Sequence, residues 1–562
     1  MRKKLELILR KAIGADIELS VPDNANFGHY STSVALKLAK SKKENPMDLA
    51  AELAAKIEKK APRNFFEKID VAAPGFINLW ISKDIIRQEL IYISRQKEKY
   101  GRSDIGKNKK VIIEYSSPNI AKPMHVGHLR SAVIGDALAN IHEFLGYKVI
   151  RWNYVGDWGT QFGKLIAAYK RWGSKAEIEK SPIKELLSLY IRFHKEEAEN
   201  PIFAQEGRDE FMKLEGGNPQ NRKLWKWFRD ESMKEFKKVY AKLGVKFDVT
   251  LGESFFEPHL KPLIERLYKK KTAVESEGAL IVHLEEKGLP PALIQKSDES
   301  SLYLTRDIAN LEYRLKKYKP AEMIYVVGNE QALHFEQLFA VAEIMHLKKT
   351  KLVHAKHGMV FGEKGKKLST RSGEAIQLDE LLQRSVNLSR EVVEKKNSKL
   401  KAKEKEKIAE AVGIGAVKYN DLRENRLSDI YFDWGKMLDF SGDSAPYLQY
   451  TQARLKSILR KARVAKKADF GLLDSETEMA LIRKMAEFPG IVKRSAEILF
   501  TNGIAKYLYE LANLANKYYE STPILTDKDI ARRNARLLLI DSVISVMENG
   551  LGLLGIKAPD KI

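Results

Sequence analysis

The chain of 562 residues contains no cysteine and no long uncharged hydrophobic run. Without cysteine it can form neither disulfide bonds nor zinc sites built from thiolates. No uncharged run approaches the length that crosses a bilayer, so no membrane-spanning helix is expected. The first residues begin like a signal peptide, but Glu6, Arg10 and Lys11 interrupt the hydrophobic stretch that such a peptide needs. We therefore expect a soluble protein of the cytoplasm.

Positive charge is in clear excess. The chain has 98 Lys and Arg against 75 Asp and Glu, which gives a formal net charge of +23. A polyanion is the natural partner of such a protein, and RNA, DNA and an anionic membrane surface all fit. A proteome rich in lysine could produce much of the same excess, so charge supports these partners without choosing among them. The length is that of roughly three or four domains.

The stretch from Tyr115 to Gly135 organises the chain. Before it, residues 109–115 read as a strand because Val111, Ile112 and Ile113 form a short hydrophobic run. The loop that follows contains two prolines, which cannot continue the strand. Hydrophobic residues then recur at helical spacing until Gly146, and a second strand is expected over 148–154. The unit is strand, loop, helix, strand.

Two histidines, His125 and His128, flank Gly127 where this helix begins. The amide groups at a helix start attract phosphate, and imidazoles can stabilise the charge that grows on phosphate oxygens during displacement. Gly127 has no β-carbon, so a base or ribose could approach the backbone closely. A single histidine here would more simply pack or cap the helix. Two of them around a glycine favour phosphate chemistry.

The string S-S-P-N-I-A-K-P-M-H-V-G-H-L-R-S resembles the first signature of class I aminoacyl-tRNA synthetases, and its flanks resemble the arginyl-tRNA synthetases. R-W-N-Y-V-G-D-W-G-T-Q-F-G, residues 151–163, is similar to another block of that family. The resemblance implies an α/β fold: a class I Rossmann-like, doubly wound parallel-sheet catalytic domain with insertions, a small α+β N-terminal domain and an all-α C-terminal anticodon-binding bundle. It also implies that L-arginine is joined to tRNA(Arg) through arginyl adenylate, with ATP as substrate and Mg²⁺ on the departing pyrophosphate.

The resemblance also assigns residues to the amino acid and to ATP. A guanidinium binds best to carboxylates, which can accept two hydrogen bonds from it, and Asp307 and Glu114 are candidates to supply these carboxylates. Tyr303 and Asp307 are expected to hold the arginine side chain with help from Glu114, while Asn119 and Gln331 bind its amino and carboxylate end. The expected ATP-binding residues are His125, Gly127, His128, Gly328 and Ser369. For His334 an adenosine contact and structural packing are equally open.

The stretch H-G-M-V-F-G-E-K-G-K-K-L-S-T-R-S-G, residues 357–373, resembles the KMSKS loop, whose cations neutralise the phosphates of ATP. Lys367, Ser369 and Arg371 fall in register with it. The usual second lysine is Thr370 here. In family members that lack it, a lysine just before the histidine motif is thought to take over, and Lys122 stands in that place. The expected catalytic residues are His125, His128, Lys122, Lys367 and Arg371.

Both ends of the chain resemble tRNA-binding parts of the family. In the N-terminal part an exposed Phe76 and Asn78 would suit stacking on a base and reading its edge, although Phe76 could be a core residue and Asn78 a turn residue. In the C-terminal part Tyr450 and Arg454 lie four residues apart, on one helix face, and are expected to bind the anticodon. A core position for Tyr450 stays open. At the last position Ile562 replaces the methionine that is common in the family.

Four regions follow from these patterns. Residues 1–100 are expected to bind the tRNA elbow, and 101–390 to form the catalytic domain, with a connecting insertion at about 170–275. Residues 391–440 read as a helical linker that contacts the stem, and 441–562 as the anticodon-binding domain. The chain is expected to return from the insertion to the main sheet at residues 279–284. We expect a monomer with no protein-built metal site.

Overall fold

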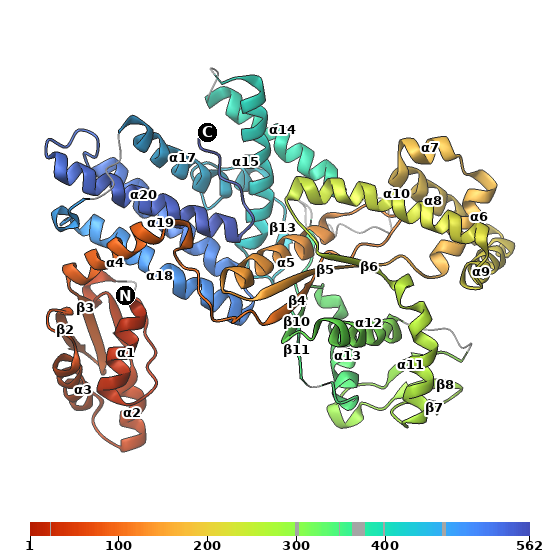
Figure 1. Cartoon of the computed structure of the whole chain (residues 1–562), viewed down its shortest axis with the longest axis horizontal. Coiled ribbons are helices and arrows are strands. Elements are labelled where there is room, and N and C mark those ends of the chain that lie inside the picture. Colours follow the sequence, from red (N-terminus) through yellow and green to blue (C-terminus); the bar gives the residue numbers. More distant parts are fainter. Residues whose placement is uncertain (23, 298–302, 348, 362–376, 397–399, 463–467) are drawn as a thin grey trace.

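The computed structural model describes residues 1–22, 24–297, 303–347, 349–361, 377–396, 400–462 and 468–562. Figure 1 shows an N-terminal α+β part at the lower left, a central sheet with inserted helices to its right, and a bundle of C-terminal helices at the upper left. The fold class predicted from the sequence is confirmed. The positions of the domain boundaries stay a prediction.

The central sheet has five parallel strands in the order β11-β10-β4-β5-β6. They are β4 (Lys110–Glu114), β5 (Lys148–Val155), β6 (Val249–Gly252), β10 (Glu322–Tyr325) and β11 (Lys351–His354). The chain runs outward from β4 through β5 to β6, and then returns to the other side of β4. The order therefore reverses between β4 and β10, where a doubly wound sheet leaves a crevice at the carboxyl ends of its strands.

Helices cover both faces of this sheet. Successive side chains of a strand point to opposite faces, so Val111 and Ile113 join the core that contains α5 (Val126–Phe144). Ile112 points the other way, into the core that contains α12 (Tyr303–Tyr318) and α13 (Ala332–Ile344). Hydrophobic residues on both sides of one strand are what a buried parallel sheet requires.

Helix α5 starts and stops where the sequence predicts. It begins directly after His125 and ends at Phe144, followed by Gly146 with φ 82°, a conformation that glycine adopts without strain. Within it, Gly135 lies against Tyr115, and a β-carbon at this glycine would come within 2.3 Å of the tyrosine side chain. The close approach of α5 to the end of β4 therefore depends on a residue without a side chain.

Helices lead into the expected insertion and make up most of it. They are α6 (Thr160–Trp172), α7 (Lys175–Lys180), α8 (Pro182–Glu199), α9 (Pro201–Glu215) and α10 (Pro219–Leu243). The predicted return to the main sheet at residues 279–284 is wrong, because β6 pairs with β5 earlier, at residues 249–252. β8 (Ala279–Val282) lies instead in a separate antiparallel sheet between β7 (Val274–Ser276) and β9 (Ala292–Gln295), after α11 (Glu257–Lys269).

The N-terminal part is a three-stranded antiparallel sheet packed with helices. Its elements are α1 (Arg2–Ile13), β1 (Tyr30–Thr32), α2 (Val34–Lys42), α3 (Pro46–Lys60), β2 (Phe66–Ala72) and β3 (Phe76–Ile81). Between α2 and α3, the Asn45 side chain accepts a hydrogen bond from Met47 N–H and caps α3. Helix α4 (Lys83–Gln96) then connects this part to the rest.

The C-terminal region is helical, as expected. It contains α14 (Leu378–Lys396), α15 (Ala402–Leu422), α16 (Trp434–Met437), α17 (Ala445–Lys461), α18 (Glu476–Ile498), α19 (Asn502–Ser521) and α20 (Ile530–Leu553). Two short parallel strands, β12 (Val360–Phe361) and β13 (Ile430–Tyr431), join it to the catalytic part. Short 3-10 turns lie at Ala25–Phe27, Lys97–Lys99, Glu253–Phe255, Glu285–Lys287, Asn329–Gln331 and Phe470–Leu472.

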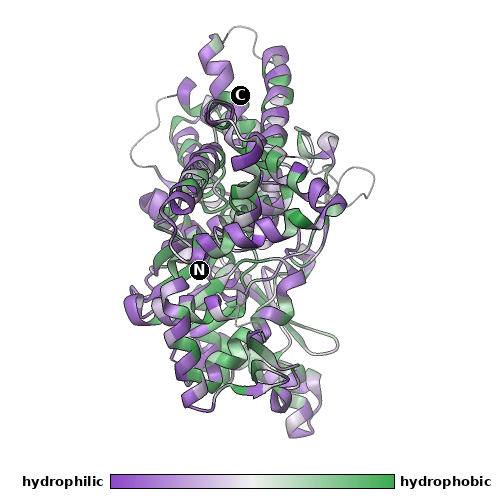
Figure 2. Cartoon of the chain, turned by 90° about the vertical axis from the view of Figure 1, so that its right-hand side faces the viewer, coloured by the Kyte–Doolittle hydropathy of each residue, from purple (hydrophilic) through white to green (hydrophobic). Residues whose placement is uncertain are grey.

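Hydrophobic and hydrophilic residues alternate along the helices of the chain, as Figure 2 shows. Among the described residues, no helix combines the length and the apolar character that crossing a membrane demands.

Gly135→Ala tests the contact between α5 and β4. The new methyl group has no room beside Tyr115, so we expect unfolding to become easier by about 3 kcal/mol, read from the midpoint of denaturant unfolding. Gly552→Ala is the matched control, because no atom lies within 4 Å of a β-carbon at that position of α20. It should be neutral or slightly stabilising. Equal midpoints for both variants would show that the contact does not constrain the fold.

Candidate active site

The loop after β4 is held by hydrogen bonds from several elements. Ser116 N–H donates to Ser131 Oγ on α5 (2.8 Å), and Ser117 N–H donates to Asn153 Oδ1 on β5 (3.2 Å). The Ser131 hydroxyl also donates to Val326 O (2.6 Å), just after β10. Ser116, Ser117 and Ala121 have positive φ values of 73°, 45° and 61°. Residues other than glycine adopt such values only where the surrounding structure holds the backbone in place. The loop is therefore preformed.

His125 and His128 complete the first turn of α5 with their own side chains. Gly127 N–H donates to His125 Nδ1, and His125 N–H donates to His128 Nδ1, both at 3.1 Å. A ring nitrogen that accepts a hydrogen bond carries no proton, so in each neutral imidazole the proton is on Nε2. Both residues thus cap the helix and present an N–H donor at the sheet edge. The two roles that the sequence left open are compatible.

The pKa values of both histidines favour the neutral form. Burial lowers the pKa of His125, and burial together with the neighbouring His125 lowers that of His128. The two rings lie 3.9 Å apart between centroids, so two positive charges there would repel each other. At neutral pH the pair can donate hydrogen bonds to an anion without carrying charge of its own.

Lys122 supplies a cation beside this turn. Its side chain is half-buried, and burial lowers its pKa. Its Nζ lies 4.9 Å from the ring centroid of Tyr190 on α8. In the part of the chain that the structure describes, no carboxylate lies within ion-pair distance of Nζ. The ammonium charge is thus available to a bound anion.

The second signature falls largely outside the described residues. Lys367, Ser369, Thr370 and Arg371 all lie in 362–376, so nothing about their placement is stated. The residues on either side of that segment are described. Phe361 belongs to β12, while Gln377 pairs with His125 and Leu378 N–H donates to Met124 O (2.9 Å). The chain therefore re-enters the described structure next to the first signature.

Gly328 also lies at this edge. It follows β10, pairs with His357, and precedes Asn329, whose N–H donates to His357 O (2.8 Å). Asn119 and Gln331, the residues expected at the two ends of the amino acid, are both exposed and lie on loops that follow β4 and β10. A parallel pairing brings Asn119 to Gly156, after β5. The carboxyl ends of β4, β5 and β10 thus carry the predicted residues together.

Glu114, the last residue of β4, is buried and forms an ion pair with Arg314 of α12. Burial works against the charge of Arg314, but the Glu114 carboxylate outweighs it and raises the pKa of the guanidinium. The same guanidinium lies 4.3 Å from the Trp152 ring centroid. Glu114 is therefore already paired inside the protein, because a carboxylate buried this deeply needs a partner, and its part in holding arginine stays a prediction.

Asp307 and Tyr303 lie one helical turn apart at the start of α12, as predicted. Tyr303 is 63% exposed. Asp307 Oδ2 lies 2.6 Å from His334 Nε2, so His334 belongs to the carboxylate cluster. Burial opposes a charge on His334, but the hydrogen bond and the charge of Asp307 outweigh it and raise its pKa. In the structure, an imidazole from the protein itself contacts Asp307.

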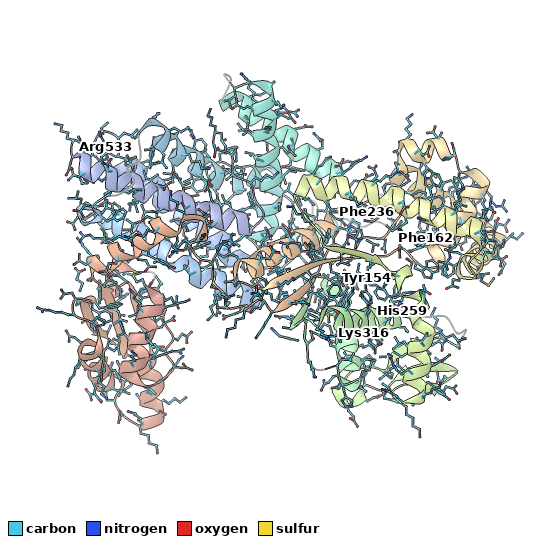
Figure 3. All side chains as sticks on the ribbon, in the orientation of Figure 1. Tyr154, Phe162, Phe236, His259, Lys316 and Arg533 are labelled. Atoms are coloured by element: carbon cyan, nitrogen blue, oxygen red, sulfur yellow. The ribbon has the colours of Figure 1, made fainter. Side chains whose placement is uncertain are left out.

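The sequence patterns missed two residues of this cluster, Glu253 and Tyr154. Glu253 directly follows β6, and burial raises its pKa to about 8 while Arg306 opposes the rise and Asp307 adds to it. Tyr154 Oη is buried with no hydrogen-bond partner among the described residues. Burial raises the pKa of Tyr154 well above its usual value, and the charges of Asp307, Glu253 and Glu114 add to it. Figure 3 shows Tyr154 near the centre of the molecule, beside the sheet.

Two carboxylates and two phenols influence one another electrostatically at this end of the sheet. Two carboxylates, Glu253 and Asp307, stand near two phenols, Tyr154 and Tyr303, at the ends of β5 and β6 and the start of α12. A carboxyl whose pKa is raised by burial gains stability when a cation binds beside it. Among the described residues, Arg306 brings a positive charge to the Glu253 side, and that guanidinium is paired with Glu257 at 2.7 Å. Asp307 is paired with His334, so a cation that binds here would be met by Glu253 after it loses its proton.

The N-terminal candidates differ in exposure. Phe76 is 36% exposed at the start of β3, whereas Asn78 is 3% exposed and accepts a hydrogen bond from the Ser31 hydroxyl (2.7 Å). The expectation of an exposed Asn78 is wrong for this structure. Asn78 lies on the central strand of its sheet, where β1 and β2 pair with it on both sides.

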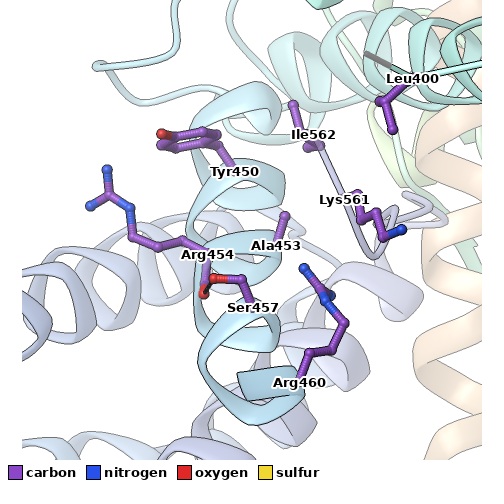
Figure 4. A pocket seen from close by; sticks show the side chains of 8 residues that line it. All are labelled: Leu400, Tyr450, Ala453, Arg454, Ser457, Arg460, Lys561 and Ile562. Carbon is purple, nitrogen blue, oxygen red and sulfur yellow. Dashed lines mark hydrogen bonds between the residues drawn. The ribbon is translucent and has the colours of Figure 1, made fainter. Parts of the chain in front are cut away.

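The C-terminal candidates share one surface, as predicted. Tyr450 and Arg454 both lie on α17, with the guanidinium 5.0 Å from the ring centroid. They line a pocket of about 250 Å³ to which the end of the chain also contributes, as Figure 4 shows. Arg460 and Lys561 add two more cations, and Ile562 supplies an apolar wall. Such a pocket combines a stacking surface with phosphate-binding groups.

Comparisons with known protein families match most of the chain in three parts. The family described as tRNA synthetases class I (R), catalytic domain, matches residues 89–434. The Arginyl tRNA synthetase N terminal domain matches residues 1–81, and the DALR anticodon binding domain matches residues 448–562.

Full-length relatives give the same result. An Arginine--tRNA ligase from Halothermothrix orenii is 42% identical over 100% of this chain and 99% of its own length, and one from Clostridioides difficile is 42% identical over 100% and 98%. Among solved structures, Thermus thermophilus arginyl-tRNA synthetase superposes with a TM-score of 0.86 at 25% identity and full coverage of both chains. The arginyl-tRNA synthetase of Plasmodium falciparum gives 0.82 at 27%, covering 100% of this chain and 99% of that protein.

Gly127→Ala tests the arrangement of the histidines. A β-carbon at Gly127 would lie 2.8 Å from His125 Cε1, so the ring must move and lose the hydrogen bond to its Nδ1. We expect His125 to change from the Nε2–H form to a mixture of tautomers, observed by NMR of protein labelled with ¹⁵N-histidine. Gly490→Ala, where the nearest atom to a new β-carbon is 3.9 Å away, should leave the spectrum unchanged. An unchanged His125 signal in Gly127→Ala would contradict the capping geometry.

Proposed function

This chain belongs to the arginyl-tRNA synthetases, and we propose that its reaction takes place at the carboxyl edge of the five-stranded sheet, where the two histidines and the carboxylate cluster meet. It is an arginine--tRNA ligase, which joins arginine to tRNA in an ATP-dependent step of translation. The observation that carries the proposal about the site is the pair of Nε2–H donors fixed at the start of α5.

In the first step a carboxylate oxygen of arginine attacks the α-phosphorus of ATP, and the bond from that phosphorus to pyrophosphate breaks. His125 and His128 donate hydrogen bonds to phosphate oxygens, and Lys122 adds a positive charge. Gly127 and Gly328 leave space for the nucleotide, and Lys367, Ser369 and Arg371 act on the phosphates. In the second step the terminal ribose hydroxyl of tRNA attacks the acyl carbon of arginyl adenylate and releases AMP.

Mg²⁺ is proposed as a companion of ATP rather than a resident of the protein. Among the described residues no group of three or more acidic or histidine side chains could hold a metal ion. The chain's contribution at this edge is a set of hydrogen-bond donors and a lysine, which suit phosphate rather than a metal. Mg²⁺ usually keeps several waters and binds through phosphates, and there it would neutralise charge on the leaving pyrophosphate.

The arginine substrate is proposed to place its guanidinium among Asp307, Glu253, Tyr303 and Tyr154. Binding there would satisfy the buried hydroxyl of Tyr154 and give Glu253 a cation. Glu114 acts indirectly, through the buried ion pair with Arg314 that joins the end of β4 to α12. Asn119 and Gln331 bind the amino and carboxylate end.

The tRNA is proposed to contact both ends of the chain. Phe76 offers an exposed ring in the N-terminal part, and Asn78 can take part only after its contact with Ser31 opens. The pocket of Tyr450 and Arg454 is proposed to hold an anticodon base. We propose a monomer, and the role in translation supports a cytoplasmic location.

ATP–pyrophosphate exchange tests the reaction and its specificity. With tRNA present we expect exchange with L-arginine, much less with lysine, and none with citrulline, which has the shape of arginine without its charge. Reactions without tRNA serve as the second arm, where we expect no exchange. No exchange under any condition would favour a protein that binds RNA without catalysis. Exchange with a different amino acid would favour another class I specificity.

Arginine affinity should depend on pH through Glu253. Below a pKa of about 8 its carboxyl holds a proton, which must leave before the carboxylate can meet a guanidinium. Affinity should therefore rise by about twenty-five-fold from pH 6.5 to 8.5, and binding at pH 7 should release protons. Calorimetry in two buffers of different ionisation enthalpy measures this release, and Glu253→Gln should abolish it. Binding without proton uptake or release in the unaltered protein would place the guanidinium elsewhere.

A further inference from the structure

The helical insertion holds the catalytic loop from outside the sheet. From α10, Ser232 Oγ accepts a hydrogen bond from Ala121 N–H (3.1 Å), and the Tyr240 hydroxyl lies 2.9 Å from Ser116 Oγ. Ser232 is fully buried, and its own hydroxyl donates to Phe228 O (2.7 Å). Ala121 has a positive φ, so the contact with Ser232 falls on a strained residue directly before Lys122. The insertion thus fixes the backbone from which Lys122 projects.

A second helix of the insertion reaches the side chain of Lys122. Tyr190 of α8 is half-buried, and its ring lies beneath Lys122 Nζ at 4.9 Å. His194, one turn further along α8, packs edge-on against Tyr190 with ring centroids 4.5 Å apart. His194 is held in turn by Glu197 at 3.1 Å, and Glu197 by Lys164 at 2.7 Å. The contacts of His194, Glu197 and Lys164 therefore help to fix the position of the Tyr190 ring.

The type of this contact matters for chemistry on phosphate. A lysine side chain has several rotatable bonds, and fixing it costs conformational entropy. A carboxylate could hold the ammonium, but it would also neutralise the charge that the phosphate needs. An aromatic ring attracts an ammonium through its quadrupole and leaves the charge intact. The described surroundings of Lys122 contain this ring and no acidic partner, which is the combination that orients a cation without neutralising it.

We propose that Tyr190 is a positioning residue for Lys122, and that the insertion serves the activation step by holding this lysine toward the phosphates of ATP. The proposal rests on the role of Lys122 in the function proposed above. Tyr190 acts through Lys122 and touches no substrate. Its effect should therefore appear in kcat of the exchange reaction, with little change in the KM for arginine or tRNA.

A graded series at position 190 tests the proposal. Tyr190→Phe keeps the ring and should keep activity within about twofold, whereas Tyr190→Leu should lower kcat by about threefold to thirtyfold, the range of a partly desolvated cation–π contact. Fluorinated phenylalanines at position 190, with one and then three ring fluorines, weaken the quadrupole while keeping the shape. We expect kcat to fall with each added fluorine. A role in packing alone would leave this series flat and would overturn the proposal.

The double variant Lys122→Ala/Tyr190→Leu separates the positioning role of Tyr190 from the catalytic role of Lys122. If Tyr190 acts through Lys122, Tyr190→Leu should cause no further loss in the Lys122→Ala background. A full additional loss there would overturn the positioning role while leaving Lys122 as a catalytic residue. A loss of less than about twofold in Lys122→Ala alone would instead remove Lys122 from the proposed function. Tyr268→Leu, which removes a tyrosine that is 52% exposed on α11, is the matched control and should leave exchange unchanged.

Discussion

The first turn of α5 is the constraint on which the catalytic site depends. A helix start leaves backbone N–H groups without partners, and here the Nδ1 atoms of His125 and His128 accept two hydrogen bonds in that turn. The same bonds decide which ring nitrogen keeps its proton, so the local structure of the helix sets the chemistry of the side chains. One arrangement of these two histidines therefore caps the helix and leaves two N–H donors for the proposed reaction.

Charge is distributed unequally along the sheet edge. At α5 the groups are neutral donors and a lysine without an acidic partner among the described residues, whereas at α12 and the ends of β5 and β6 carboxylates and phenols gather. A nucleoside triphosphate suits the first group and a guanidinium suits the second. The strand order reverses between β4 and β10, which is where a doubly wound sheet leaves a crevice at the carboxyl ends of its strands. In the proposed function, the two groups bring oppositely charged substrates together at this edge.

The sequence predicted the elements that local pattern determines. The strand, loop, helix and strand around His125 follow from a hydrophobic run, two prolines and helical spacing, and all are present. The sequence did not predict β6, because a four-residue edge strand is too short to show a clear alternation of polar and apolar residues. Glu253 directly follows β6 and was missed for the same reason, since its importance comes from burial beside Asp307. The Glu114–Arg314 pair joins residues 200 positions apart, and the burial of Asn78 depends on β1 pairing beside it. No local signal encodes such contacts.

Helix α5 is buried on all its faces, and the C-terminal helices supply part of that cover. Arg130, two residues after His128, is fully buried and pairs with Asp421 of α15 at 3.2 Å, and Lys418 of the same helix donates to Gly555 O beyond α20 (2.7 Å). Removing the C-terminal helices would expose apolar surface of α5 and leave the buried Arg130 guanidinium without the Asp421 carboxylate. Contacts of α15 therefore join the matched regions 89–434 and 448–562, and a shortened chain that ends before α15 would leave Arg130 and the apolar surface of α5 uncovered.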